Sequence, residues 1–292
     1  MFRGEVAALA AAGLWAFATL LFGRLGKRLS PLVLNLVKGG VAIALIVVTL
    51  LLRQQLLIRL PSQAALLLLV SGVVGIGLGD TAYFGTVNDL GPRRALLMET
   101  LAPPLSALMA WGLIGERLSS AAWIGIGVTL LGVAWVVGER AAVGEIQNLR
   151  RGILLGILAA AGQATGAVLS RAALADTGID PLWSALLRLF AGLLCLGLIL
   201  LGRPAWGRGM GHLRSGRLLA GVAVAAFFGT YLAIWLQQTA FKFAETGIAQ
   251  ALLATSPVFV LPMAAAIGER ITGRAIVGAL VASGGVCLLF LG

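Results

Sequence analysis

The stretch from Met98 to Gly132, METLAPPLSALMAWGLIGERLSSAAWIGIGVTLLG, decides the fold, because a close echo of it, ATSPVFVLPMAAAIGERITGRAIVGALVASGG, returns at residues 254–285. Aligned without gaps, positions 101–132 and 254–285 share ten identities in 32. The run Ile114 to Arg117 recurs unchanged as Ile267 to Arg270. Each copy is typical of an apolar helix broken near its middle by proline, a charged Gly-Glu-Arg turn, and a second apolar helix with spaced glycines.

Composition places the chain among integral membrane proteins. Of its 292 residues, 60% are hydrophobic and 11% are charged, an apolar excess beyond what a soluble core needs. The formal net charge of +11 would favour nucleic acid in a soluble protein, but these basic residues stand singly or in pairs between apolar runs, as topology determinants do. Cys195 and Cys287 both lie inside apolar runs. We therefore expect no nucleic-acid partner, no disulfide and no metal site.

Ten apolar stretches are each long enough to cross a bilayer, which takes about 20 helical residues. They are residues 5–24, 31–52, 64–87, 94–115, 118–138, 152–174, 181–202, 217–241, 246–267 and 273–291. A polar segment at 139–151 separates five stretches from five. The sequence therefore predicts an all-α membrane protein with a first five-helix repeat at 1–138, a linker at 139–151 and a second repeat at 152–292.

The sequence similarity between the two halves extends to the start of each half. Leu9 to Gly13 recurs as Leu158 to Gly162, and Lys38 corresponds to Arg188. Because five is odd, the second copy must enter the membrane from the opposite side, which predicts an inverted repeat. Two such halves can expose a midplane site to each side in turn, the mechanism of secondary transporters. A duplicated structural bundle without transport is the alternative.

Together these features resemble the EamA-type proteins of the drug/metabolite transporter superfamily. The resemblance covers the whole chain and rests on features present in both copies. These are the fourth-helix prolines Pro103, Pro104 and Pro257, the Gly-Glu-Arg runs at 115–117 and 268–270, and the glycine pairs 125/132 and 278/285. The resemblance implies a ten-helix transporter of small metabolites, amino acids or drugs, commonly outward, across a bacterial inner membrane. It does not imply one substrate.

The orientation of the chain in the membrane follows from its basic residues. Of 22 Lys and Arg, Lys38 and Arg188 lie deep within spans, six lie in segments or at span ends on the side of the N-terminus, and fourteen lie in those on the opposite side. Since basic loops stay in the cytoplasm, the count predicts both termini outside. The resemblance leans instead toward cytoplasmic termini.

Four charged residues lie well inside the predicted spans, away from the span ends: Lys38, Asp80, Glu99 and Arg188. Charges there are costly and usually face a cavity or a partner. We predict that Asp80 and Glu99, with Lys38 between them, form an ionic centre near one membrane face that holds a proton or an amine. Arg188, at comparable depth from the other face, would take a carboxylate. Snorkelling of Lys38 to the interface, or a purely structural Glu99–Lys38 pair, are the simpler alternatives.

Polar and aromatic side chains within the spans complete the predicted substrate or proton site. They are Tyr83, Trp15, Asn35, Gln163, Tyr231, Trp235 and Gln250, with Thr100, Gln237, Gln238 and Thr255 as further candidates. Each of these could instead pack against a neighbouring helix. Pro103, Pro104 and Pro257 remove backbone donors and are the predicted hinges.

Enzyme motifs are missing from the sequence. The single histidine, His212, lies in a polar loop, and neither a HExxH nor a phosphate-binding GxxxxGK motif occurs. We therefore expect a non-enzyme without cofactor, in which transport is driven by a solute gradient or by protons. A lipid flippase or a non-transporting subunit of a membrane complex is the alternative. The glycine runs of spans 118–138 and 273–291 could serve a dimer seam, but a chain that contains both repeats favours a monomer.

Overall fold

The computed structural model describes residues 2–25, 31–55, 60–90, 92–137, 148–201, 216–266 and 272–291. Its elements are α1 (Arg3–Leu25), α2 (Pro31–Leu52), α3 (Ser62–Ser71), η1 (Gly72–Gly79), α4 (Asp80–Leu90), α5 (Pro92–Glu99), α6 (Ala102–Ile114), α7 (Ser120–Val137), α8 (Leu149–Leu174), α9 (Pro181–Leu201), α10 (Gly216–Ala226), η3 (Phe227–Leu232), α11 (Ala233–Phe243), α12 (Thr246–Leu253), α13 (Ser256–Ala266) and α14 (Gly273–Leu291). The second Gly-Glu-Arg run, linker residues 139–147 and His212 lie outside the described residues.

The helices make this a multi-pass membrane protein. Seven of the described helices are long and apolar enough to cross a bilayer, and the stretches Ala102–Ile114 and Ser120–Trp135 are shorter apolar helices. Among the described residues the structure is all-helical, as the sequence predicted. The number of ten spans stays a prediction.

Proline explains why the fourth and ninth stretches are each divided in two. α5 ends at Glu99, and the N–H that Pro103 lacks is the one that would bond to the Glu99 carbonyl four residues earlier. In the second half α12 ends at Leu253, four residues before Pro257. Each proline therefore leaves the carbonyl at the end of the preceding helix without its helical donor, and the chain turns there.

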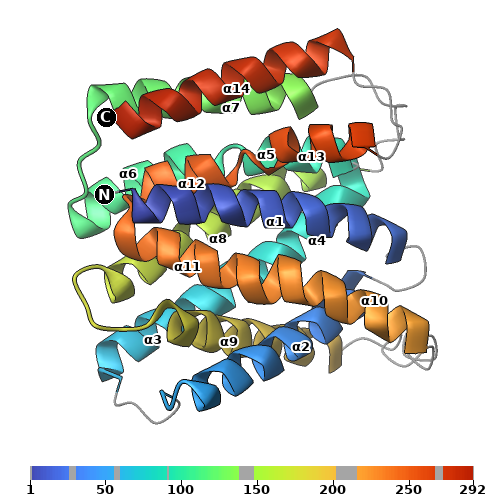
Figure 1. Cartoon of the computed structure of the whole chain (residues 1–292), viewed down its shortest axis with the longest axis vertical. Helices are drawn as coiled ribbons and strands as arrows, with labels where there is room; N and C mark the ends of the chain where they lie inside the picture. Colours follow the sequence, from blue (N-terminus) through green and yellow to red (C-terminus); the bar gives the residue numbers. More distant parts are fainter. Residues whose placement is uncertain are drawn as a thin grey trace.

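The two halves of the chain interlock throughout the bundle. α1 packs against α11, and at the equivalent place of the other half α8 packs against η1 and α4. α2 contacts α9, α6 contacts α12, and α7 contacts α14. α7 and α14 run side by side at one edge of the molecule, α2 and α9 lie at the opposite edge, and both chain ends lie at one end of the bundle (Figure 1).

Glycines bring α7 and α14 into backbone contact. A Cβ atom at Gly132 would overlap the backbone of Ala282, and one at Gly285 would overlap the backbone of Thr129. Such close approach is possible only where one of the two helices carries no side chain at the contact. The glycines considered for a dimer seam thus form a contact between the two halves of one chain.

Two π-helical segments occupy equivalent places in the third helix of each half. η1 precedes Asp80 directly, and η3 joins α10 to α11. A π-helical turn holds more residues than an α-helical one and is frequent at functional sites. It also changes which side chains face the bundle interior.

Candidate functional site

A cavity of about 340 Å³ lies where the two halves meet. The helices α1, α2, η1 and α4–α7 contribute to its walls from the first half, and α8, α9, η3 and α11–α13 from the second. Eight of the eleven predicted binding residues line it: Trp15, Lys38, Asp80, Tyr83, Glu99, Gln163, Arg188 and Gln250. Pro103 and Pro257 line it as well, because the helix breaks that they cause open onto the cavity.

Asp80 lies at the centre of the charged residues. The side-chain nitrogen of Gln163, from α8, donates a 3.1 Å hydrogen bond to its carboxylate. The positive charges of Lys38 and Arg188 act on the same carboxylate, and the amide of Asn35 lies beside it. Asn35 is itself buried and does not line the cavity. Asp80 therefore interacts with charges from both halves, which joins the two predicted half-sites into one.

Arg188 reaches this site through a slot between glycines. A Cβ atom at Gly72 would overlap the Arg188 backbone, so α9 passes close to η1. Cβ atoms at Gly75 and Gly166 would lie 3.4 Å from one guanidinium nitrogen. The residue is 2% exposed, and within the described part of the chain its Nε and Nη1 have no hydrogen-bond partner. A buried guanidinium with open donors suits a carboxylate or another anion.

Glu99 is the second carboxylate of the cavity. It is the last residue of α5, directly before the helix break. Its Oε1 is buried and lacks a hydrogen-bond partner among the residues described here, and the nearby Asp80 carboxylate repels it. The sequence predicts Lys38 between the two carboxylates, and in the structure Lys38 interacts electrostatically with Asp80. Glu99 is therefore the acidic group best placed to meet a cation or a proton.

Side chains of the first helix in each half bond to the π-helical segment of the other half. The indole nitrogen of Trp15, on α1, donates to the Gly229 carbonyl of η3 at 2.9 Å. The amide of Gln163, on α8, points in the same way at the Gly75 carbonyl of η1, at 3.5 Å. These contacts place both side chains at the cavity wall and connect the halves there.

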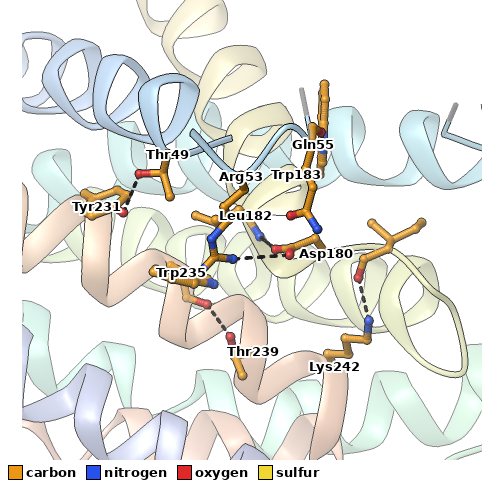
Figure 2. Close-up of polar contacts among 11 residues, drawn as sticks. Thr49, Arg53, Gln55, Asp180, Leu182, Trp183, Tyr231, Trp235, Thr239 and Lys242 are labelled. Atoms are coloured by element: carbon orange, nitrogen blue, oxygen red, sulfur yellow. Dashed lines mark hydrogen bonds and ion pairs between the residues drawn. The ribbon is translucent and has the colours of Figure 1, made fainter. Parts of the chain in front are cut away.

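Tyr231 and Trp235 do not line the cavity, which corrects their predicted place. The Tyr231 hydroxyl is 2.8 Å from the Thr49 hydroxyl on α2, and the Arg53 guanidinium lies 4.8 Å from the centre of the Trp235 ring. Figure 2 shows both aromatic side chains, Tyr231 of η3 and Trp235 of α11, on the side of this continuous helix that faces α2 and α9. The neighbouring residues Thr230 and Ile234, four apart, line the cavity instead. One residue along a helix turns a side chain by about 100°, which moves Tyr231 and Trp235 off the cavity.

The further polar candidates divide between the cavity and the helix contacts. Thr100 and Gln237 line the cavity, whereas Gln238 is fully buried and accepts a 2.7 Å hydrogen bond from Ser184. Thr255 donates to the Leu252 carbonyl at 2.6 Å.

Sequence reasoning missed the lining residues Thr230 and Ser256. Ser256 directly precedes the helix-breaking Pro257, a signal that could have found it. Thr230 lies in a π-helical segment that the sequence did not reveal.

These features define a multi-pass membrane protein whose two similar halves enclose a polar, charged cavity. Residues 2–138 and 150–291 each match the EamA-like transporter family, and the chain belongs to that family. This family of membrane transporters is part of the drug/metabolite transporter superfamily.

Two further proteins are similar to this chain. "Uncharacterized protein PA1977" of Pseudomonas aeruginosa is 35% identical over 147 residues, which are 49% of this chain and 46% of that protein. The match thus spans about half the length of this relative. A solved chain described as "Crystal structure of protein" superposes on this chain with a TM-score of 0.83 at 20% sequence identity. The match covers 99% of this chain and 96% of the solved chain. At that identity the likeness establishes the fold alone.

Proposed function

We propose that this protein is a secondary transporter that exports a small solute across the bacterial inner membrane by alternating access. The observation that carries the proposal is the cavity between the two halves, into which both halves send charged side chains. The described chain also has no cluster of acidic, histidine or cysteine side chains suited to a metal ion, and the sequence has no nucleotide-binding motif that would supply energy. A solute gradient or protons would then drive transport.

The topology in this proposal is ten spans in two inverted five-helix repeats, at 1–138 and 152–292, joined by the linker 139–151. Reciprocal packing supports it, because the first helix of each half contacts the third helix of the other. The breaks after α5 and α12 also occupy equivalent places. Midplane sites formed by broken helices at a repeat interface are typical of secondary transporters.

The substrate in this proposal is a zwitterion. Glu99 offers an acceptor oxygen without a partner, and Arg188 offers two donors without partners in the described chain. An ammonium group would bind the first and a carboxylate the second, while Asp80 and Lys38 neutralise each other. A cavity of about 340 Å³ is at the small end of ligand pockets and suits a metabolite rather than a lipid.

Reconstituted liposomes test the proposal. We expect the purified protein to move a labelled zwitterionic amino acid at least about tenfold faster than the matching amine or carboxylate, since each lost charge-assisted hydrogen bond is worth about 1.5–3 kcal/mol. Collapse of the proton gradient should lower accumulation. Protein-free liposomes are the control. Movement of a fluorescent phospholipid instead would indicate a flippase, and movement of neither would indicate a non-transporting subunit.

A further inference from the structure

An ion pair joins the two halves at the end of the bundle that carries the chain ends. Glu116 follows the end of α6, after Gly115 with its left-handed φ of 74°, and Arg171 lies in the last turn of α8. The Glu116 carboxylate accepts a hydrogen bond from Nε of Arg171, and the two side chains are 12% and 18% exposed. At that burial the pair is screened less by water and salt than a surface pair.

The remaining polar atoms of this pair hold two more helix ends. Nη1 of Arg171 donates to the carbonyls of Phe241 and Lys242, at 3.2 and 2.7 Å, where α11 ends. The second carboxylate oxygen of Glu116 accepts the backbone N–H of Thr246, at 2.8 Å, where α12 begins. A carboxylate at a helix N-terminus and a cation at a C-terminus are both favourable placements. Glu116 of the first half thus bonds to α8 and α12 of the second half, and its partner Arg171 also holds the end of α11.

Those three helices are walls of the cavity, and the ion pair lies beyond its end. Gln163 lines the cavity eight residues before Arg171 on α8, a rise of about 12 Å. Gln237 lines it four residues before Phe241 on α11, and Gln250 lines it four residues after Thr246 on α12. All three helices therefore run from the cavity to the ion pair within one to about two turns.

We propose that the Glu116–Arg171 ion pair is a gate. It keeps the cavity closed toward the membrane face that carries the chain ends, and the two side chains separate when the cavity opens to that face. Opening on that face requires α6 to move away from α8 and α12, the two helices of the second half that it contacts there, and Glu116 bonds the end of α6 to both. The inference rests on the proposed function, since a protein without alternating access needs no gate.

Cysteine accessibility tests the gate without any substrate. The reporter is Ser256→Cys, which lines the cavity, in a chain with Cys195→Ala and Cys287→Ala. A membrane-impermeant maleimide is added to liposomes from the face that carries the chain ends. Glu116→Gln should speed labelling of the reporter roughly tenfold, the shift expected when one charge-assisted hydrogen bond is lost.

The matched control is Arg53→Gln. It removes the Arg53–Asp180 ion pair on the same face, which is more exposed than the Glu116–Arg171 pair. The labelling rate of the Ser256→Cys reporter should not change in this control. Should Glu116→Gln fail to fold, Glu116→Asp keeps the charge but is one methylene too short to hold both partners, and labelling should still rise a few-fold. Unchanged labelling in the variant that folds would overturn the gate. Because labelling needs no solute, a protein that opens but moves no zwitterion would contradict the proposed substrate and leave the gate intact.

Discussion

At the residue scale, the chemistry of the cavity depends on which charged atoms have protein partners. Asp80 interacts with Gln163, Lys38 and Arg188, so its negative charge is largely compensated within the protein. Glu99 keeps an oxygen without a partner among the described residues. The two carboxylates therefore have different roles in the proposal, with Asp80 ordering the site and Glu99 meeting the amine or the proton.

Replacement of Glu99 by glutamine tests this division. Glu99→Gln should fold, yet bind the amine group of a zwitterion roughly tenfold or more weakly, because a charge-assisted hydrogen bond becomes a neutral one. Binding to purified protein is measured by thermal stabilisation with ligand. Asp176→Asn is the matched control, because this acidic residue lies in an exposed turn with a φ of 54° that asparagine tolerates. Unchanged amine affinity in Glu99→Gln would remove Glu99 from the site.

Glu245 has a pH-dependent role outside the membrane spans, between α11 and α12. Burial and the carboxylates of Glu116 and Glu5 raise the pKa of Glu245 above its ordinary value of 4.5, while Arg171 acts in the opposite direction. A raised pKa in the folded state means that the neutral form fits better. The stability that Glu245 contributes is therefore complete below its unfolded pKa and is lost as pH rises through the folded one.

The variant Glu245→Gln should keep that contribution at every pH. In detergent, its melting temperature should match that of the unaltered protein near pH 4 and exceed it by about 1–3 °C at pH 8, allowing for partial exposure. Asp176→Asn should show no such divergence. A variant that is less stable than the unaltered protein at pH 8 would mean that Arg171 dominates and that the charged form is the favoured one.

At the scale of elements, the broken helices place functional atoms at the cavity. The break after α5 exposes Glu99 and Thr100, and the break after α12 exposes Leu253 and Ala254, to the same space. Both breaks lie four residues before a proline, as expected if the missing backbone donor ends the helix. That these breaks act as hinges stays a prediction.

Replacing Pro103 and Pro104 restores two backbone N–H donors, which should make the helix break between α5 and α6 more rigid. With Pro103→Ala and Pro104→Ala together, net flux in liposomes should fall about tenfold or more while substrate affinity stays within about threefold, since an interior proline costs a helix about 3 kcal/mol and its removal favours the straight form. Pro262→Ala is the control, because Pro262 lies within α13 and is not among the cavity residues. Equal flux in the double variant and the unaltered protein would show that the break does not move during transport.

At the scale of the whole molecule, the interlocked halves imply one topology in the membrane. In the proposed topology, five spans per half put the linker on the face opposite to both chain ends, which lie at one end of the bundle (Figure 1). The count of fourteen basic residues against six predicts that the linker side lies in the cytoplasm. The resemblance to the family leans the other way.

Alkaline phosphatase fusions distinguish these orientations, since the enzyme is active only outside the cytoplasm. We expect a fusion at the C-terminus to be at least about tenfold more active than one inserted after residue 143 in the linker. The reverse ratio would place both termini in the cytoplasm while preserving the inverted topology. Equal activity at the two positions would contradict five spans per half.

The sequence by itself determined the class, the two halves and the places of the helix breaks. These follow from local properties: apolar length, the repeat of Met98–Gly132, and prolines whose effect reaches only four residues back. It also indicated Asp80, Glu99 and Lys38, because a charge in an apolar span is costly wherever the span packs.

Only the tertiary structure decided which of the polar side chains meet. Arg188 joins Asp80 because glycines on η1 and α8 leave a slot for it, and Tyr231 and Trp235 turn toward α2 because the cavity lies on the adjacent face of their helix. Glu116 of the first Gly-Glu-Arg run forms an ion pair with Arg171 of the other half. Helical periodicity places a residue on a face of its own helix, but the neighbour of that face is set by packing between segments far apart in the sequence.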